Sequence, residues 1–485
     1  MIKQIKYATL LLLGLLYWSP AGAESFEVGN YQYTILDAEA KTVKVQRNPN
    51  VTVASVTSIV IADEVEYNSV TYKITEVYTF RNCSIATAIS IGNNVTKISN
   101  GAFQGCGKVT NVTIPASVTS IGTSAFEECR KLQTANLGAA EGLTELGASI
   151  FKNCEKLYNA VLPPNLTIVP SSAFYGCYEL ATITIPATVT KVNTKAFYGC
   201  GKLKTIVCET TIAPTITSSD VDALSLVTDA TIQVLSTAAK ESFESNATWM
   251  AAASEVTVVS LGVAEDSDNS ALLQHHNGHT ADVSLTRTIR HEGYNSLCLP
   301  FALSAEQVTA AFGDGCDIQE LRDDSNISAE GIEINFSKVT SMEAGKPYLV
   351  KPAATVTNPA FINMVMTDEI ASSITDDVDF VGVFSPTDLP AEQDVLILGE
   401  GNTLHPLSAD DREISGMRGY FVLKTEQART AAKRGVKMVV NSKEGGTGIE
   451  VVTENTPQAT KCLHNGQLHI IRNGVHYDAQ GKVIQ

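Results

Sequence analysis

The four-residue pattern Phe-x-x-Cys recurs six times between Phe80 and Cys200. The copies are Phe80/Cys83, Phe103/Cys106, Phe126/Cys129, Phe151/Cys154, Phe174/Cys177 and Phe197/Cys200, so successive cysteines lie 23, 23, 25, 23 and 23 residues apart. A fixed period of this length is typical of a repeat array, in which each copy buries its apolar face against its neighbours. The sequence therefore predicts a solenoid that presents an extended surface.

The apolar positions between the cysteines repeat as well. Leu180, Ile183 and Ile185 follow Cys177, and Pro186 comes next. The same offsets after Cys106 hold Val109, Val112, Ile114 and Pro115, and those after Cys154 hold Leu157, Ala160, Leu162 and Pro163. This is the L-x-x-L-x-L spacing of a leucine-rich repeat, in which alternate residues of a short strand point inward.

Six of the ten cysteines stand on this period. Because free cysteine behaves as a small buried apolar residue, we predict a column of core thiols. Neighbouring coils would lie about 5 Å apart, which is within disulfide range, so distance alone does not exclude bridging. We expect Cys298 and Cys316 to be separate buried thiols, with a bridge between them as the alternative.

Units such as Leu-Ala-Thr-Ile-Thr-Ile-Pro-Ala-Thr-Val-Thr-Lys-Val-Asn-Thr-Lys-Ala-Phe-Tyr-Gly-Cys, residues 180–200, resemble the BspA-like leucine-rich repeats of bacterial cell-surface proteins. The resemblance extends over roughly residues 55–260. It implies an exported protein of the cell surface or extracellular space. The expected role is that of an adhesin, whose partners are host matrix proteins, glycoproteins or other cells.

The strand residues that point away from the predicted core form a candidate binding face. They are small and mostly neutral: Ser90, Asn111, Thr113, Thr134, Asn136, Asn159, Thr182, Thr184 and Thr205. Solenoids use such extended faces for partners. A solvated sheet would also select threonine through β-propensity alone, so the sequence leaves both interpretations open.

The segments around the repeats indicate a signal peptide and two caps. Residues 1–23 contain Lys3, Lys6, an apolar run and a small-x-small ending at Ala23, the pattern of a cleaved secretory signal. An uncleaved anchor helix is the alternative, although the apolar run is shorter than the roughly 20 residues that span a bilayer. Residues 24–76 form the predicted N-terminal cap, with strands at 26–28, 31–35 and 42–45, and residues 77–260 the solenoid with a C-terminal cap that contains Trp249.

A second module follows. Residues 280–440 contain at least seven short extended runs separated by turns, which predict a β-sandwich-like domain, with a helix from Ser304 to Phe312. Residues 460–485 predict a hairpin tail that turns at Asn473-Gly474. Residues 265–270 suggest a polar junction, and His275, His276 and His279 are expected in a solvated connector, because no further ligand completes a metal site. The fold class is therefore mainly β.

The net charge of the chain and the motifs in its sequence limit the classes of function that it can have. The net charge of −17 and the pI near 5.0 disfavour nucleic acids and anionic lipid surfaces. No catalytic motif is present, so we predict no enzyme, no catalytic residues, no cofactor and no metal site. We expect a monomer whose mature chain has no transmembrane segment. A structural protein of the cell envelope is the alternative, and a glycan-processing accessory protein or enzyme that uses the sandwich domain is the second.

Overall fold

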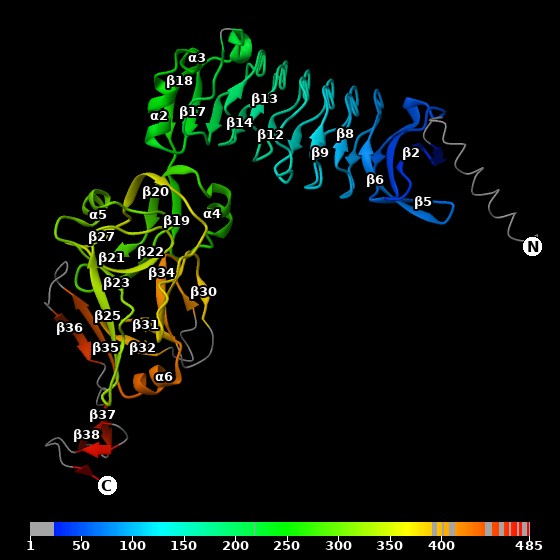
Figure 1. Ribbon diagram of the computed structural model, residues 1–485. Coiled ribbons are helices and arrows are strands. Elements are labelled where there is room, and N and C mark those ends of the chain that lie inside the picture. Colours follow the sequence, from blue (N-terminus) through cyan, green and yellow to red (C-terminus); the bar gives the residue numbers. More distant parts are fainter. Residues whose placement is uncertain are drawn as a thin grey trace, which may run out of the picture. The chain divides into compact units, whose positions relative to one another are not determined.

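The computed structural model describes residues 24–217, 219–389, 395–399, 402–406 and 413–441, and five strands between residues 449 and 484. Residues 1–23, where we predict the signal peptide, lie outside the described residues. The chain divides into two compact units, with the boundary between Val259 and Ser260. Both units are mainly β, and the first contains the leucine-rich-repeat-like units (Figure 1).

Antiparallel strands extend the repeats at their N-terminal end. They are β1 (Ser25–Val28), β2 (Tyr31–Asp37) and β3 (Thr42–Arg47), which confirms the strands expected there. β3 pairs in parallel with β6 (Val70–Val77), and the ladder continues through β8 (Lys97–Ile98) to β10 (Ser120–Ile121). β5 (Glu64–Tyr67) pairs with β6, and β4 (Ile59–Val60) pairs with β7 (Ile89–Ser90). A short 3-10 helix, η1 (Val53–Ser55), precedes β4.

The repeats are joined by a seven-stranded sheet in which all pairs are parallel. Its strands are β9 (Asn111–Thr113), β11 (Thr134–Asn136), β12 (Asn159–Val161), β14 (Thr182–Ile185), β16 (Thr205–Cys208), β17 (Ala230–Val234) and β18 (Ala253–Val258). Figure 1 shows these strands following one another along the first unit. A second, shorter ladder joins β13 (Ile168–Val169) to β15 (Lys191–Val192).

The ladder phenylalanines form one continuous column inside the repeats. Phe80, Phe103, Phe126, Phe151, Phe174 and Phe197 are all 0% exposed. Neighbouring rings stack with centroids 6.0, 5.3, 5.6, 5.6 and 5.4 Å apart. The predicted burial is confirmed, and each of the four rings between Phe80 and Phe197 has an equivalent ring on both sides.

The cysteines form a second column, and the thiols from Cys106 to Cys200 are also hydrogen-bond donors. Cys129 donates to the carbonyl oxygen of Phe103 at 3.3 Å, and Cys177 donates to that of Phe151 at 3.2 Å. Cys106, Cys154 and Cys200 make the equivalent bond at 3.2–3.4 Å. All cysteines whose side chains the structure describes are free, including Cys298 and Cys316. Burial raises the pKa of Cys200 to about 12 and that of the other column thiols in the same direction.

The residue before each ladder cysteine has a left-handed backbone. The φ values are 59° at Asn82, 74° at Gly105, 59° at Glu128, 58° at Asn153, 71° at Gly176 and 78° at Gly199. Glycine and asparagine tolerate this conformation best, which explains why they hold five of these six positions. This turn allows the cysteine, three residues after the phenylalanine, to point into the core as well.

The C-terminal end of the repeats is covered by short helices. They are η2 (Val221–Leu224), α2 (Thr237–Glu244), capped by Ser236, and α3 (Ala247–Met250). Trp249 is 0% exposed, donates its indole N–H to the carbonyl oxygen of Pro214 at 2.8 Å, and meets Phe243 edge-on. The interpretation of Trp249 as a buried aromatic at this end is therefore confirmed.

The second unit begins earlier than the predicted sandwich domain. β19 (Leu261–Ala264) pairs with β20 (Thr280–Thr286), which pairs with β28 (Ala360–Val365). The expected solvated connector is wrong, because residues 270–276 form helix α4 (Ser270–His276), in which His276 is 6% exposed. Burial, with His275 and His279 nearby, lowers the pKa of His276 to about 4.

The polar junction expected at residues 265–270 is also a fixed part of this unit. Asn269 is 3% exposed, and its side-chain amide donates to the carbonyl oxygens of Ala264, Ser267 and Phe384. Its backbone N–H donates to the hydroxyl of Ser385 at 2.9 Å. These partners are up to 116 residues away along the chain, which is why the local polarity of the segment was misleading.

Two larger sheets share the core of the second unit. One contains β22 (Asn295–Cys298), β23 (Asp317–Leu321), β24 (Asn326–Ile327), β25 (Ile332–Val339), β26 (Pro347–Lys351), β35 (Val436–Asn441) and β36 (Ile449–Glu454). The other contains β29 (Val378–Val383), β31 (Val395–Leu398), β32 (Leu404–Pro406) and β34 (Arg418–Leu423). Phe336 of the first sheet meets Phe380 and Phe421 of the second edge-on, so side chains of both sheets form one apolar cluster. The expected extended runs are confirmed as strands.

Smaller elements complete this unit. Short pairs join β21 (Thr288–Ile289) to β27 (Val356–Thr357), and β30 (Thr387–Asp388) to β33 (Glu413–Ile414). The predicted helix is α5 (Ala305–Phe312), capped by Ser304, and α6 (Glu426–Ala432) follows β34. β37 (Thr460–His464), β38 (Gln467–Arg472), β39 (Val475–Tyr477) and β40 (Val483–Ile484) form an antiparallel sheet. β38 and β39 are the expected hairpin strands, and their turn at residues 473–474 lies outside the described residues. Among the helices that are described, none is long and apolar enough to cross a membrane.

Replacing one ladder ring tests the phenylalanine column. We expect Phe174→Ala to lower the free energy of unfolding by about 3–5 kcal/mol, because it leaves a cavity between two stacked neighbours. Urea denaturation followed by circular dichroism measures the loss. Tyr178→Ala is the matched control, since Tyr178 is 54% exposed and lies in the same repeat. Equal effects of the two substitutions would contradict a column that supports the fold.

Thiol labelling tests the cysteine column. We expect Cys106, Cys129 and Cys177 to resist iodoacetamide in the native protein and to react completely in urea, because a buried thiol with a raised pKa supplies little thiolate. Mass spectrometry of the digested protein reports each site separately. Cys316, which is partly exposed, serves as the internal reference and is expected to react faster. Rapid native labelling of the three column thiols would show that the column is open to solvent.

Candidate functional site

The outer face of the seven-stranded parallel sheet brings together eight of the nine predicted site residues. One row across the strands consists of Asn111, Thr134, Asn159, Thr182 and Thr205, which are direct register partners. A second row contains Thr113, Asn136 and Val161, and continues with Thr184 and Val207. We call these two rows the strand face. The residues that the sequence separated by 23 or more positions therefore lie side by side.

The strand face exists because the strands alternate between core and solvent. The inward residues Val112, Ala135, Ala160, Ile183 and Ile206 are at most 3% exposed. Their neighbours along each strand point outward: Asn111, Thr113, Asn136, Asn159 and Thr182 are exposed, and Thr134, Thr184 and Thr205 are partly exposed. The period of two in the strand thus places hydroxyl and amide groups on one surface.

Ser90 does not belong to this sheet. It is exposed on β7, and it pairs with Val60 of β4 in a separate two-stranded ladder. Ser90 stands at the same position of its repeat as Thr113 does in the next, and the sequence therefore predicted that it belongs to the strand face. However, β7 is not hydrogen-bonded to β9.

The structure extends the strand face beyond the predicted residues. Thr231 and Gln233 on β17 continue the two rows, because they pair with Thr205 and Val207. Glu255 and Thr257 on β18 follow them. The alternation of apolar and polar residues at 230–234 could have predicted that β17 extends the strand face. Residues 253–258 lack the repeat motif, so they could not be aligned with the repeats.

The strand face offers neutral hydrogen-bonding groups. In the part of the chain that the structure describes, the side chains of Asn159, Thr182 and Thr205 have no protein partner, which leaves their polar groups available to water or to a ligand. The eight predicted residues include no carboxylate, imidazole or thiol. Hydroxyl and amide groups alone are poor ligands for transition metals and supply no general acid or base at neutral pH.

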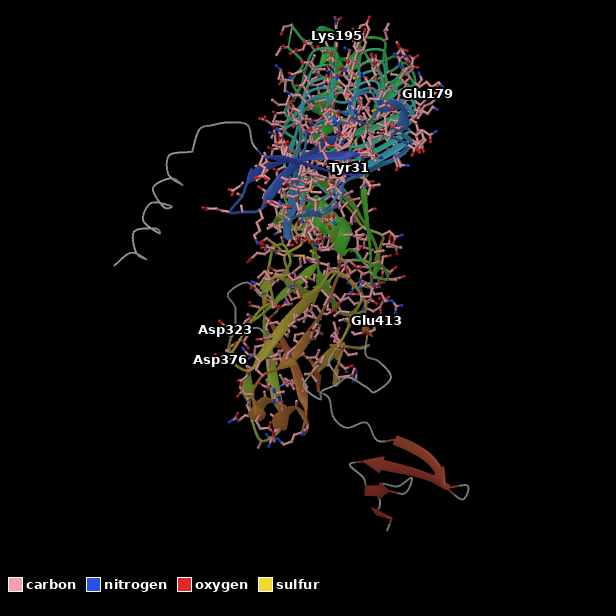
Figure 2. All side chains as sticks on the ribbon, turned by 90° about the vertical axis from the view of Figure 1, so that its right-hand side faces the viewer. Tyr31, Glu179, Lys195, Asp323, Asp376 and Glu413 are labelled. Atoms are coloured by element: carbon pink, nitrogen blue, oxygen red, sulfur yellow. The ribbon has the colours of Figure 1, made fainter. Side chains whose placement is uncertain are left out.

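A column of lysines flanks the start of the strands. Lys108, Lys131, Lys156 and Lys202 each stand two residues after a ladder cysteine. Glu179 takes the equivalent place after Cys177, and Ile85 takes it after Cys83. Glu179 binds Lys202 at 2.6 Å and Lys156 at 3.5 Å, and the hydrogen bond from Lys202 is the main reason that its pKa is lowered. Figure 2 labels Glu179 at the rim of the first unit. Such exposed ion pairs contribute little stability.

A second set of exposed threonines shows a different pattern. Thr96, Thr119, Thr167 and Thr190 immediately precede β8, β10, β13 and β15. Each hydroxyl donates to the carbonyl oxygen of the threonine one repeat earlier, at 3.2–3.4 Å. Because these hydroxyls already bond within the repeats, this column is a natural control surface for the strand face.

Comparison with known proteins identifies the repeat. Residues 73–213 match the family model of the BspA type leucine rich repeat region in six copies. The repeat region of this chain is a BspA-type leucine-rich repeat region, as its sequence indicated. No curated protein matches the chain.

Several solved structures are similar to parts of the chain. A leucine rich cell surface protein from Faecalibacterium prausnitzii A2-165 is 26% identical, with a TM-score of 0.34, over 41% of this chain and 58% of that one. The chain therefore matches a little over half the length of this relative. A leucine rich repeat protein from T. pallidum is 24% identical, with a TM-score of 0.33, over 38% of this chain and 81% of that one. A leucine-rich repeat protein from Bacteroides ovatus is 18% identical, with a TM-score of 0.25, over 49% and 82% of the two chains.

Proposed function

We propose that this protein is an exported adhesin of the cell surface or extracellular space, which binds protein or glycoprotein ligands on host or neighbouring cells. The strand face is the proposed contact surface. The observation that carries the proposal is the alignment of eight predicted residues in two rows across one parallel sheet. The BspA type of the repeats is consistent with a protein-binding role at the cell surface.

The chemistry of the strand face supports a macromolecular partner. Short threonine and asparagine side chains lose little conformational entropy when they are covered, so they can make hydrogen bonds at low cost. On β11, β12, β14 and β16 the backbone is held on both sides by parallel pairing, which keeps the groups in place before binding. Repeat arrays commonly bind partners through such extended surfaces.

We also infer the organisation that this function requires. Residues 1–23 act as the signal peptide, residues 24–76 as the N-terminal cap, and residues 77–260 as a solenoid with its C-terminal cap. The two sheets that meet at Phe336, Phe380 and Phe421 support a β-sandwich-like domain at residues 280–440, and the paired strands at residues 460–485 support the tail. The mature chain acts as a monomer.

A charge placed on the strand face tests the proposal. The protein without residues 1–23 is titrated onto immobilised fibronectin, type I collagen and mucin, and binding is followed by surface plasmon resonance. We expect Thr182→Arg to weaken saturable binding at least about tenfold, because a large cation would be buried against the partner without a counter-charge. Thr190→Arg is the matched control, since it adds the same charge to an exposed threonine of the other column. Thermal melting checks that both variants fold.

Two outcomes would contradict the proposal, the first its adhesin function and the second its contact surface. One is the absence of saturable binding to all three surfaces together with unchanged cell adherence after deletion of the gene, which would favour a structural role in the envelope. The other is equal binding by the Thr182→Arg and Thr190→Arg variants, which would exclude the strand face as the contact surface.

A further inference from the structure

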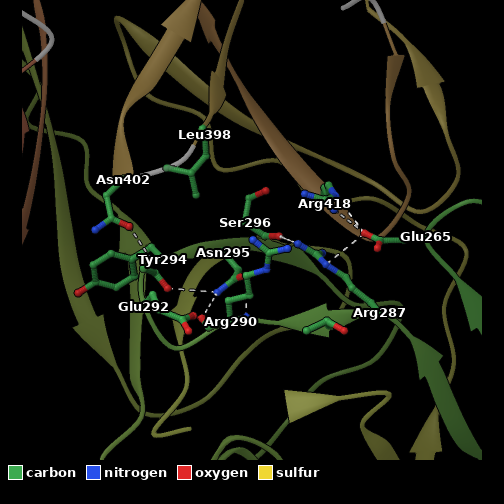
Figure 3. Close-up of a pocket in the computed structure, with 13 residues that line it drawn as sticks. Glu265, Arg287, Arg290, Glu292, Tyr294, Asn295, Ser296, Leu398, Asn402 and Arg418 are labelled. Carbon is green, nitrogen blue, oxygen red and sulfur yellow. Dashed lines mark hydrogen bonds and ion pairs between the residues drawn. The ribbon is translucent and has the colours of Figure 1, made fainter. Parts of the chain in front are cut away.

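The second unit contains a pocket of about 810 Å3 that is unrelated to the strand face. Its wall is built from segments far apart in the sequence: Glu265 after β19, Arg287 after β20, the loop of residues 290–294, Asn295 at the start of β22, and Arg418 at the start of β34. Figure 3 shows Arg287 and Arg418 directed toward Glu265 on one side, and Tyr294 and Asn402 on the other. Its volume is in the range of small-molecule sites.

The pocket is cationic although the chain is strongly acidic. Arg287, Arg290 and Arg418 line it, opposed by Glu265 and Glu292. These five side chains carry a formal net charge of +1, whereas the whole chain carries −17. A local excess of positive charge in a concave site attracts anions.

Arg287 is buried at this wall with an incompletely satisfied guanidinium. It is 4% exposed, and it donates to the carbonyl oxygens of Met417 at 2.6 Å and Ser296 at 2.8 Å. Its Nε makes no hydrogen bond to any residue that the structure describes, and Glu265 Oε2 lies 3.4 Å from it. Burial, followed by repulsion from Arg418, lowers its pKa to about 9, so an anion nearby would stabilise its charged form.

One carboxylate is shared between two guanidinium groups. Arg418 donates to Glu265 Oε2 through Nη2 at 2.6 Å and through Nε at 3.2 Å. The same oxygen is the closest carboxylate to Arg287. Because Glu265 carries a single negative charge, it cannot neutralise both arginines. A second anion would complete the arrangement.

Arg290 supplies a further cation that makes no ion pair within the described residues. Its guanidinium has no hydrogen bond or ion pair among the residues that the structure describes. The loop that carries it is nevertheless held in place: Asn295 accepts from the backbone N–H of Arg290 at 3.1 Å and donates to its carbonyl oxygen at 2.7 Å. Asn402 accepts from the backbone N–H of Tyr294 at 2.6 Å. A cation on a fixed loop is preorganised for a ligand.

The rest of the lining selects the kind of anion. Thr288 and Ser296 present hydroxyl groups, and Tyr294, which is 9% exposed, forms part of the wall. Such hydroxyl groups can donate hydrogen bonds to the hydroxyl groups of a sugar and accept hydrogen bonds from them. A bare inorganic anion would fill only a small part of the volume.

We propose that this pocket binds an acidic saccharide, a sugar residue that carries a carboxylate or a sulfate ester, with its anionic group facing the three arginines. The binding is independent of the strand face and of the proposed adhesin function. It involves no chemical step. The second unit would therefore bind a different class of ligand from the first.

Isothermal titration calorimetry of the chain without residues 1–23 tests the proposal. The probes are a hyaluronan tetrasaccharide, which carries carboxylates, a 6-sulfated N-acetyllactosamine tetrasaccharide, which carries sulfates, and chitotetraose, which is neutral. We expect at least one acidic probe to bind at a single site and chitotetraose not to bind. The acidic probe that binds identifies the anionic group.

Substitution of Arg290 localises the site. We expect Arg290→Ala to weaken binding of the acidic probe at least about tenfold, because a charge-assisted hydrogen bond is lost. Arg290→Lys is expected to weaken this binding less. Arg290 is exposed on a loop, so thermal melting is expected to show no change for either variant. Arg434→Ala, at another exposed arginine of this unit, is the matched control and is expected to bind normally.

The proposal is overturned if neither acidic probe binds at millimolar concentration, if chitotetraose binds as tightly as they do, or if Arg290→Ala binds normally. Sodium sulfate is added as a competitor in a separate titration. Displacement of the saccharide by an equal concentration of inorganic sulfate would mean that the pocket is a plain anion site and would also overturn it.

Discussion

The contact between one repeat and the next is the interaction on which the first unit depends. Each ladder phenylalanine stacks on its equivalents 5.3–6.0 Å away, and each ladder thiol from Cys106 to Cys200 donates to the carbonyl oxygen of the phenylalanine one repeat earlier. No single repeat can bury these groups alone, so stability accumulates from neighbour to neighbour. The ends therefore need other residues, which the strands β1–β3 and the buried Trp249 supply.

This internal column leaves the outer residues free to vary. The spacing of the strand face is set by backbone pairing, about 4.8 Å between strands, whatever side chain stands outside. Threonine and asparagine then determine its chemistry, which is neutral and capable of hydrogen bonding. The lysines beside it are partly paired across repeats, as at Glu179, so charge is concentrated at the margin of the face.

The second unit uses a different design. Its pocket depends on a buried arginine whose carbonyl partners are Ser296, nine residues away on β22, and Met417, 130 residues away just before β34. Burying such a charge is costly unless it is compensated, and the single carboxylate of Glu265 is shared between two arginines. An arrangement of this kind is poorly explained by stability alone, because well-packed apolar residues often serve a core at least as well. It is better explained by a ligand that brings the missing charge.

The sequence by itself determined the repeats, the inward and outward residues of their strands, the BspA type, and the strands and helix of the second unit. It could do so because these features depend on local periodicity, and the period of the phenylalanines and cysteines directly records which residues meet. The tertiary structure alone decided the thiol hydrogen bonds, the separation of Ser90 from the strand face, the buried position of Asn269 and His276, and the pocket. Glu265 and Arg418 are 153 residues apart. No local pattern brings such residues together, since their proximity follows only from how the strands of the second unit pack.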